Sequence, residues 1–311
     1  MRLTPFPKDL FVSGRRHLFV FAHQDDDLPI AGILHRCAGS GTAVWVTNGD
    51  GLAPMAGVSP EEYAATRRGE AVQALTILGW KPGRLHFLEV SELSNYQLFI
   101  DLARLPQEGK FSALAVTPSV RRRIRDLTDG VVQRLVALVR DAEVVWTMAW
   151  QGGHVEHDLT HFLTVQAVRV VEREQGRTIP IYEYPEYELN YLVTLRYPFW
   201  KKGERHRLRI TEEEAALKER VFDAYRSQAE LTRSFKRLIM VKGMLSVLVG
   251  SPFTFEGFIR EEEFGPVAAG IDYMKPPHGQ DRLEYIGEDY KGVPVRFGCS
   301  LRPIIRAVLQ G

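Results

Sequence analysis

The sequence has little cysteine, no long hydrophobic run and no excess of charge of either sign. Its 311 residues include two cysteines, Cys37 and Cys299, which are too few for a disulfide framework and lack the spacing of a zinc-binding cysteine motif. This usage favours a reducing, cytoplasmic setting. The 40 Lys and Arg almost balance the 39 Asp and Glu, for a net charge of +1. The composition therefore gives no electrostatic footprint for nucleic acid, and none is expected as a partner.

Membrane insertion is not expected either. The apolar run Leu18 to Ala22 stops at His23, so the N-terminus lacks the hydrophobic region of a secretory signal. The most apolar tract, Leu238 to Val249, is interrupted by Lys242 and is far shorter than the roughly 20 residues that span a bilayer. With 45% hydrophobic residues, the chain has enough apolar side chains for a sizeable core, which excludes intrinsic disorder.

Short β-branched and aromatic runs alternate with longer amphipathic stretches. The runs predict strands over Leu18 to Ala22, Ala43 to Thr47, Arg84 to Val90, Val144 to Trp150 and Ile179 to Tyr184. The stretches predict helices over Leu28 to Cys37, Pro60 to Leu78, Asp126 to Val139, Leu159 to Glu174 and Ile210 to about Lys236. Near-continuous apolarity predicts strands buried on both faces. We therefore expect a Rossmann-like, doubly wound α/β fold with a mostly parallel sheet.

Helix punctuation and composition define the rest of the organisation. Ser59 before Pro60 is the expected N-cap of the second helix, and Thr211 with Glu214 forms an expected capping box. We expect one domain over residues 1–235 and an extension over residues 236–311. The extension is rich in Gly, Pro, Phe and Tyr, and we expect an irregular subdomain packed on the same domain near the mouth of the site. Within it, Val293 to Phe297 is strand-like.

The first polar cluster, His23-Gln24-Asp25-Asp26-Asp27, follows the first predicted strand. Ligands of open α/β sheets bind at the carboxyl ends of the strands. A histidine with two or three carboxylates at this place offers nitrogen and oxygen ligands to a divalent metal and leaves one carboxylate as a base. Alternatively, the three aspartates only cap the next helix and complement its dipole.

The second cluster, Gly152-Gly153-His154-Val155-Glu156-His157-Asp158, follows the strand that ends at Trp150 and opens the next helix. It is therefore expected on the same edge of the sheet as His23. The two histidines, three residues apart, can point into one crevice from a single helical turn. The alternative, two polar histidines at a helix N-terminus, loses weight because both clusters are placed at one edge.

A third element, Thr47-Asn48-Gly49-Asp50-Gly51, is a glycine-rich turn after the second strand. It either lines the same crevice or is simply a tight turn. Arg67 and Glu70 follow on the next helix, where their i, i+3 spacing also fits a surface salt bridge. We take Asn48 and Asp50 as candidate substrate contacts.

Together, the segments AHQDDD, TNGDG, RRGEAVQALTILG and GGHVEHD resemble the LmbE-like (PIG-L) family of zinc-dependent N-deacetylases. Members show AHPDDE, a TNGDG-like turn, an R-x-x-E helix ending in LG, and GHPDH. The resemblance covers about the first 190 residues, and a later stretch ending in Tyr225-Arg226-Ser227-Gln228 is similar to a further family motif. The chain departs from the family at Gln24 for Pro, Asp27 for Glu and Val155-Glu156 for Pro-Asp. Glu156 keeps the charge and is expected to orient a neighbouring ring.

The resemblance implies roles for the matching positions. His23, Asp26 and His157 would be the zinc ligands, with another divalent metal as an alternative, and Asp25 the general base. His154 would stabilise the tetrahedral intermediate and protonate the leaving amine, and Arg67 would contact the substrate. No ligand or base position is lost.

The implied function is removal of an N-acyl group, foremost acetyl, from a glucosamine-type sugar in a glycoconjugate or secondary metabolite. The expected partner is thus a small N-acylated amino sugar. Two alternatives remain open. One is an amidase of the same fold acting on a non-sugar or thiol-conjugate amide, and the other is a catalytically silent sugar-binding homologue.

Overall fold

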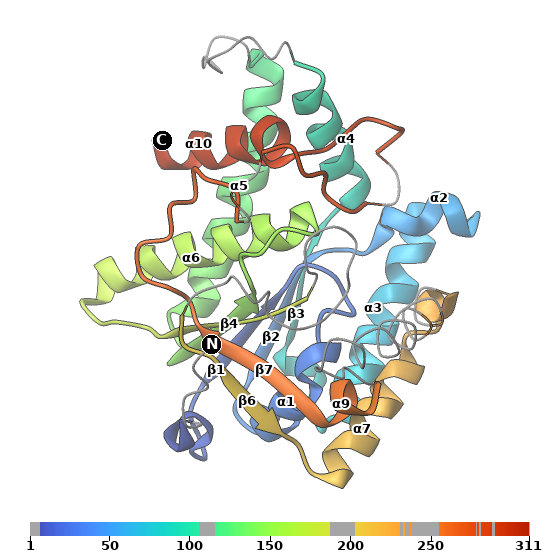
Figure 1. Cartoon of the computed structure of the whole chain (residues 1–311), viewed down its shortest axis with the longest axis vertical. Coiled ribbons are helices and arrows are strands. Elements are labelled where there is room, and N and C mark those ends of the chain that lie inside the picture. The colour runs from blue at the N-terminus through green and yellow to red at the C-terminus, as the bar shows by residue number, and fades with distance from the viewer. Residues whose placement is uncertain are drawn as a thin grey trace, which may run out of the picture.

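A seven-stranded sheet forms the centre of the molecule in the computed structural model (Figure 1), in the order β3-β2-β1-β4-β5-β7-β6. The structure describes residues 7–105, 116–186, 203–230, 255–277, 281–287 and 290–310, together with positions 233, 237 and 279. The strands are β1 (His17–Phe21), β2 (Thr42–Thr47), β3 (Leu85–Val90), β4 (Val144–Met148), β5 (Ile181–Tyr184), β6 (His206–Arg209) and β7 (Glu261–Pro266). Strands β1 to β5 pair in parallel, and β7 joins β5 and β6 antiparallel. The predicted mostly parallel α/β fold is confirmed.

Helices cover both faces of the sheet (Figure 1). The longer ones are α1 (Ala31–Cys37), α3 (Pro60–Ile77), α4 (Glu92–Ala103), α5 (Pro118–Val139), α6 (Val155–Gln175), α7 (Glu212–Ala224) and α10 (Arg302–Gln310). Short elements are α2 (Ala53–Ala56), α9 (Phe255–Arg260), a π-helical segment η7 (Phe297–Leu301) and the 3-10 turns η1 (Lys8–Phe11), η2 (Leu28–Ile30), η3 (Asp50–Leu52), η4 (Pro82–Arg84) and η6 (Arg226–Gln228). One apolar core lies between the sheet and α4, α5, α6 and α10, and the other between the sheet and α1, α3 and α7.

The five predicted strands form within a few residues of their expected limits. Strands β1, β2 and β4 are almost entirely buried on both faces, as their continuous apolar runs predict, whereas β3 and β5 are partly buried. Two helices begin earlier than predicted. Helix α5 starts at Pro118, where Thr117 accepts a hydrogen bond from Val120 N, and α6 starts at Val155 with His154 as its N-cap. Polar residues in these first turns hide the apolar periodicity on which the prediction relied. The predicted Ser59 cap and the Thr211–Glu214 capping box are both present.

The C-terminal part of the chain differs from the prediction at two places. The long helix predicted from Ile210 is interrupted: α7 ends at Ala224, because the backbone of Tyr225 leaves the helical region (φ −83°, ψ 66°), a 3-10 turn follows, and positions 229, 230, 233 and 237 are helical again. Residues 293–297 form no strand; Arg296 makes an isolated bridge to Glu284, and the π-helical turn begins at Phe297. The predicted domain boundary near residue 235 and the apolar tract Leu238 to Val249 lie outside the described residues, so the boundary stays a prediction.

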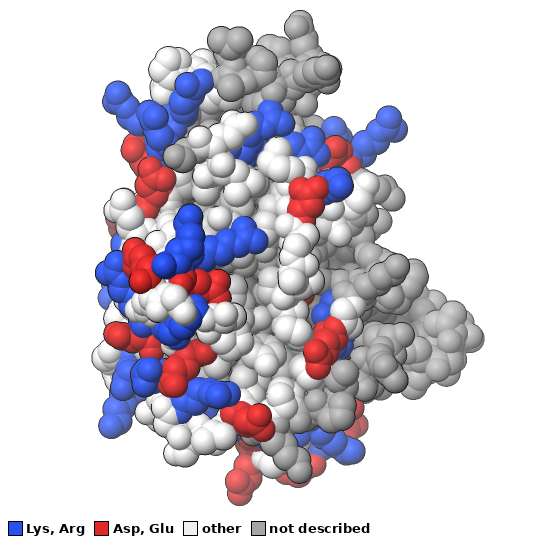
Figure 2. Space-filling view, turned by 90° about the vertical axis from the view of Figure 1, so that its left-hand side faces the viewer, with Lys and Arg blue, Asp and Glu red and all other residues white. Residues whose placement is uncertain are grey.

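Charge is dispersed over the surface that can be inspected. Figure 2 shows Lys and Arg interspersed with Asp and Glu on the face it presents, with no continuous area of one sign among the residues drawn in colour. Among the described residues, none of the helices has the length and apolarity that crossing a membrane requires.

A buried ion pair ties α7 to β7 and to the start of α1. Lys218 Nζ lies 3.0 Å from Glu262 Oε1 and donates to the Pro29 carbonyl at 2.9 Å. The Glu262 carboxylate also accepts the amides of Gly32 and Ile33 at 2.8 and 2.9 Å. Both charged side chains are fully buried. Removing only the lysine would leave the Glu262 carboxylate buried without its charged partner.

We predict that Lys218→Met lowers the free energy of unfolding by about 3–5 kcal/mol, because a buried charge loses its partner. Urea unfolding at pH 7 measures the change. Arg140→Ala is the control, since its pair with Glu174 is about half exposed on each side and is worth less than about 1 kcal/mol. Equal losses in the two variants would contradict the prediction.

Candidate active site

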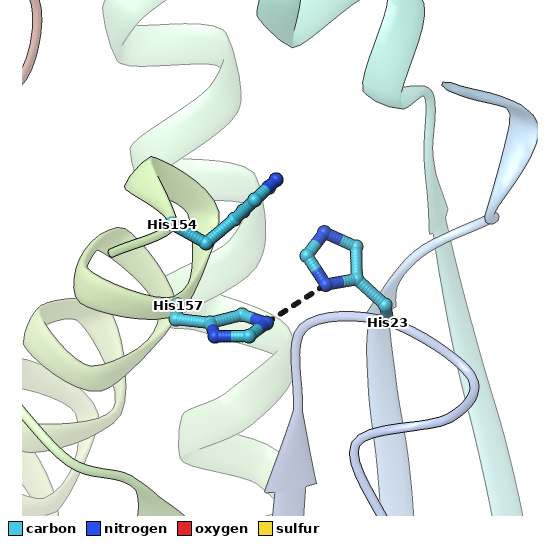
Figure 3. Close-up of side chains that lie close together, drawn as sticks. All are labelled: His23, His154 and His157. Carbon is cyan, nitrogen blue, oxygen red and sulfur yellow. Dashed lines mark hydrogen bonds between the residues drawn. The ribbon is translucent and has the colours of Figure 1, made fainter. Parts of the chain in front are cut away.

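Three histidines converge where β1 and β4 end at the same edge of the sheet. His23 lies on the turn after β1, while His154 and His157 come from the first turn of α6 (Figure 3). His23 Nδ1 is 3.0 Å from His157 Nε2, and the ring centroids of His23 and His154 are 4.7 Å apart. Parallel strands bring their carboxyl ends together, which explains why residues 134 positions apart meet here.

Asp26 joins this cluster through both of its carboxylate oxygens. Oδ2 accepts the amides of Ala22 and His23 at 2.9 and 2.7 Å. Oδ1 lies 3.1 Å from His157 Nε2 and 3.6 Å from His23 Nδ1. Burial by itself raises the pKa of Asp26, but the charges of His157 and His23 outweigh it and hold the pKa well below its usual value. The carboxylate is therefore ionised and faces the two imidazoles.

These three side chains fit a divalent metal. A tetrahedral ion with bonds of roughly 2.0–2.1 Å separates its ligand atoms by about 3.3 Å. The distances between His23 Nδ1, His157 Nε2 and Asp26 Oδ1 are 3.0, 3.1 and 3.6 Å, close to that value. His154 lies near enough to count as a further candidate, since its ligand atom is within 4.8 Å of those of His23 and His157.

The other nitrogen of His23 faces two carboxylates. Its Nε2 is 3.0 Å from Glu156 Oε2 and 4.0 Å from Glu92 Oε1. Burial alone lowers the pKa of His23, but the charges of Glu92 and Asp26 hold it well above its usual value. His23, Glu92 and Glu156 form a second set that has metal-ligand spacing. Glu156 contacts the neighbouring ring, as the sequence led us to expect.

The carboxylates of that second set have other partners. Glu156 Oε1 accepts from the Asn95 side-chain amide at 2.6 Å. Glu92 accepts from the hydroxyl of Thr47 at 2.7 Å and from the amide of Gly51 at 3.1 Å. Asp26 accepts the backbone amides with Oδ2 and directs Oδ1 at His157 and His23, so the set with Asp26 is the better candidate for a metal, and Glu156 is suited to orient His23.

Sequence reasoning missed Glu92 and Asn95, because it did not predict α4. The signal was present: Ser91 follows β3 directly and caps the helix by accepting from Ser94 N at 3.2 Å. The rule that placed His23 and His154 at one edge also applies to the residues after β3. Applied there, it would have added Glu92 to the site.

Asp25 and Arg67 form an ion pair beside the cluster. Arg67 Nη2 donates to Asp25 Oδ1 at 2.6 Å, and Arg67 Nη1 lies 3.8 Å from Glu70. Only 4% of the arginine is exposed. Burial lowers the pKa of Arg67, but the charges of Asp25 and Glu92 more than compensate and raise it. Arg67 thus orients Asp25, and its expected contact with substrate stays a prediction.

The TNGDG turn lies beside the His23 turn. Asp50 is buried and accepts from the Ser91 hydroxyl at 2.7 Å and from Leu93 N at 3.1 Å, while Asn48 Oδ1 accepts from Asp50 N at 3.1 Å. Both side chains thus hold the turn in place. Their expected contact with substrate stays a prediction.

His154 is buried, and its Nδ1 accepts from Glu156 N at 3.4 Å, which places the proton of the neutral ring on Nε2. Burial lowers the pKa of His154 well below its usual value, and the charges of His23 and His157 add to this effect. The ring is therefore neutral at rest.

The chain is similar to a known protein family and to several solved structures. Residues 18–168 match the model of the PIG-L family, described as GlcNAc-PI de-N-acetylase. No curated protein matches the chain. The fold is similar to that of a triple mutant of a deacetylase in the teicoplanin biosynthetic pathway, with 16% identity, a TM-score of 0.50, and coverage of 83% of this chain and 99% of that one.

Two more solved structures are similar at lower scores. One is N,N'-diacetylchitobiose deacetylase from Pyrococcus horikoshii in complex with an inhibitor, with 17% identity, a TM-score of 0.49, and coverage of 84% of this chain and 86% of that one. The other is a conserved protein from Thermus thermophilus, with 18% identity, a TM-score of 0.47, and coverage of 82% of this chain and 95% of that one.

Fold and site together define an α/β protein with a histidine–carboxylate centre at the carboxyl edge of a mostly parallel sheet. Residues 18–168 of the chain form a domain of the PIG-L (LmbE-like) family of N-deacetylases. The resemblance that the four sequence motifs indicated is thereby confirmed.

Gly49 permits the close approach of the two turns. Its φ is +79°, and a Cβ atom there would overlap Gln24 Oε1 and lie 2.9 Å from Arg67 Cβ. Gly57 also has a positive φ, +69°, but an added Cβ would meet no atom within 4 Å. The two glycines therefore separate the cost of the backbone conformation from the cost of packing.

We predict that Gly49→Ala lowers the free energy of unfolding by about 1–3 kcal/mol more than Gly57→Ala, because overpacking adds to backbone strain. Denaturant unfolding of both variants measures the difference. Similar losses in the two variants would mean that the turns adjust without cost.

Proposed function

We propose that this protein is a metal-dependent N-deacetylase that removes an acyl group, foremost acetyl, from the amino group of a glucosamine-type sugar. The convergence of His23, Asp26 and His157 beside Asp25 and His154 carries the proposal. It occurs in a chain whose residues 18–168 match the PIG-L family model. The similar structure from the teicoplanin pathway is described as a deacetylase, which agrees with this reaction class.

We assign His23, Asp26 and His157 as the ligands of a zinc ion, with another divalent metal as an alternative. Bound there, zinc would polarise the acyl carbonyl and acidify a water molecule. Two imidazoles and one carboxylate are the ligand types that zinc accepts, and three protein ligands leave a position for substrate or water. Glu156 would accept the Nε2 proton of His23 and fix the orientation of that ring.

Asp25 and His154 are assigned the proton transfers. Arg67 holds Asp25 Oδ1, so we assign the proton taken from the attacking water to Oδ2. His154 presents its Nε2 proton to the oxyanion. Because the ring is neutral at rest, the proton that Asp25 takes from the water would pass to His154 as the carbon–nitrogen bond breaks, and His154 would donate it to the departing nitrogen; Asp25 is then ionised again for the next turnover.

The proposal also includes a cytoplasmic location and the residues that would contact the sugar. Cys37 and Cys299 are both free thiols, which suits the reducing cytoplasm. We retain Arg67, Asn48 and Asp50 as candidate substrate contacts, because they lie on the turn and helix that border Asp25.

The metal assignment predicts about one zinc per chain and a large loss of zinc in His157→Ala, since a three-ligand site that loses a ligand binds far more weakly. Metal analysis of the purified, dialysed proteins measures it. His161→Ala is the control, because His161 is a buried histidine on the same helix that contacts Met148 O at 2.8 Å and Tyr273 OH at 2.9 Å. Unchanged zinc in a folded His157→Ala variant would remove this ligand set.

The assignment of proton transfers predicts that Asp25→Asn and His154→Ala keep their zinc but lower kcat by roughly a hundredfold or more. Acetate release from N-acetylglucosamine conjugates measures turnover. Wild-type turnover in Asp25→Asn would require another base, and loss of zinc in either variant would make that residue a ligand. A silent sugar-binding homologue would bind these conjugates without releasing acetate, and an amidase of the same fold would release it only from non-sugar amides.

A further inference from the structure

The loop that carries His154 depends on contacts from outside the loop. Gly152 and Gly153 have φ values of +79° and +92°. Few residues other than glycine adopt this conformation, and glycine populates positive and negative φ about equally, so the glycines alone do not fix the loop. The loop amides of Gln151 and Gly152 both donate to Asp158 Oδ1 at 3.2 Å. Asp158 thus folds the loop back onto the first turn of α6.

A segment far along the chain holds both the loop and Asp158. Tyr285 donates its hydroxyl proton to Asp158 Oδ2 at 2.8 Å, and Ile286 N donates to the Gly153 carbonyl at 2.6 Å. His154 and Ile286 also form an isolated parallel β-bridge. Two consecutive residues of this segment therefore make contacts on both sides of His154, Ile286 at Gly153 and Tyr285 at Asp158.

Tyr285 is itself well anchored. Its side chain is 5% exposed, and its amide donates to the Val295 carbonyl at 2.9 Å. Burial raises the pKa of Tyr285 well above its usual value, and the charge of Asp158 raises it further. The phenol therefore keeps its proton and donates it to the carboxylate, a charge-assisted hydrogen bond in a buried place.

We propose that Tyr285 is a positioning residue for His154, acting through Asp158 and the Gly152–Gly153 turn. The segment 284–287 lies beyond residues 18–168, which match the family model. The inference rests on the proposed function, because it assigns His154 a role in turnover.

The effect of this support on turnover depends on the position of the His154 ring. A displaced ring loses its alignment with the reacting atoms, and misplacement by about 1 Å can reduce turnover on the order of a hundredfold. Removing one hydrogen bond from a supporting group typically has a smaller effect, roughly tenfold to a hundredfold for groups that orient active-site side chains. The zinc ligands His23, Asp26 and His157 do not depend on this loop for their contacts with one another.

The test compares Tyr285→Phe with Tyr273→Phe. Each substitution removes one hydroxyl that this C-terminal part of the chain directs at α6, since Tyr273 OH is 2.9 Å from His161 Nε2. Of these two hydroxyls, it is that of Tyr285 that donates to Asp158. We expect Tyr285→Phe to lower kcat roughly tenfold, with KM within twofold of wild type and zinc content unchanged. Tyr273→Phe should leave kcat within about twofold.

A second arm tests whether Tyr285 acts through His154. In the His154→Ala background, Tyr285→Phe should lower the residual kcat no further, because two residues that act as a unit are not additive. An equal loss of kcat in Tyr285→Phe and Tyr273→Phe, or a full additional loss in the His154→Ala background, would overturn the proposal.

A third arm does not depend on the reaction. Hydrogen exchange of the Gln151 and Gly152 amides should be at least severalfold faster in Tyr285→Phe than in wild type or Tyr273→Phe, because Asp158 loses the group that fixes it. If wild type released no acetate from any conjugate but exchange still increased, the proposed function would fail and the support of the loop would stand. Unchanged exchange would overturn the support itself, whatever the activity.

Discussion

The carboxylate of Asp26 is the interaction on which the site depends. Its Oδ2 accepts two backbone amides at the end of β1, and its Oδ1 faces the imidazoles of His23 and His157. One side chain thereby fixes the shape of the turn and places a negative charge beside the imidazoles of His23 and His157. An asparagine at this place could still accept the two amides, but it would present an NH2 donor to the imidazoles, so the second function requires an ionised aspartate. The sheet supplies the second condition, because β1 and β4 are adjacent and parallel.

Much of the fold and the centre of the site follow from local sequence. A strand buried on both faces needs a continuous apolar run, and such runs are recognisable without knowledge of tertiary contacts. His23 comes shortly after β1, and His154 follows β4 after the short loop 149–153, so the parallel order of β1 and β4 brings them together. The extent of α5 and α6 was harder to predict, since their first turns are polar and capped by Thr117 and His154.

What could not be predicted depends on partners distant in sequence. Nothing in the sequence pairs Lys218 with Glu262, and only the fold, through β7, places them 3.0 Å apart in the core. Similarly, Tyr285 reads as one aromatic residue in an irregular tail, and only the fold brings it to Asp158, 127 positions earlier. The strand β7 itself, with three consecutive glutamates, has no apolar pattern. Its two neighbouring strands and the amides of α1 compensate for that composition.

The divergent motif residues Gln24 and Asp27 acquire a physical explanation in the same way. Gln24 is fully buried, and its side-chain amide donates to the Thr47 carbonyl at 2.9 Å. This contact joins the turns after β1 and β2, so a hydrogen bond stiffens a turn that a proline ring would otherwise stiffen. The substitution therefore changes how the turn is held and leaves the position of His23 intact.

Asp27 is fully buried at the end of the aspartate run. Burial raises the pKa of Asp27 well above its usual value, and the charges of Asp25 and Asp26 raise it further. The Tyr225 hydroxyl contacts both Asp27 Oδ2 and the Gln24 carbonyl, yet a phenol has one proton to donate. The phenol therefore satisfies one of these acceptors at a time, and its contacts tie the aspartate run to the residue that follows α7.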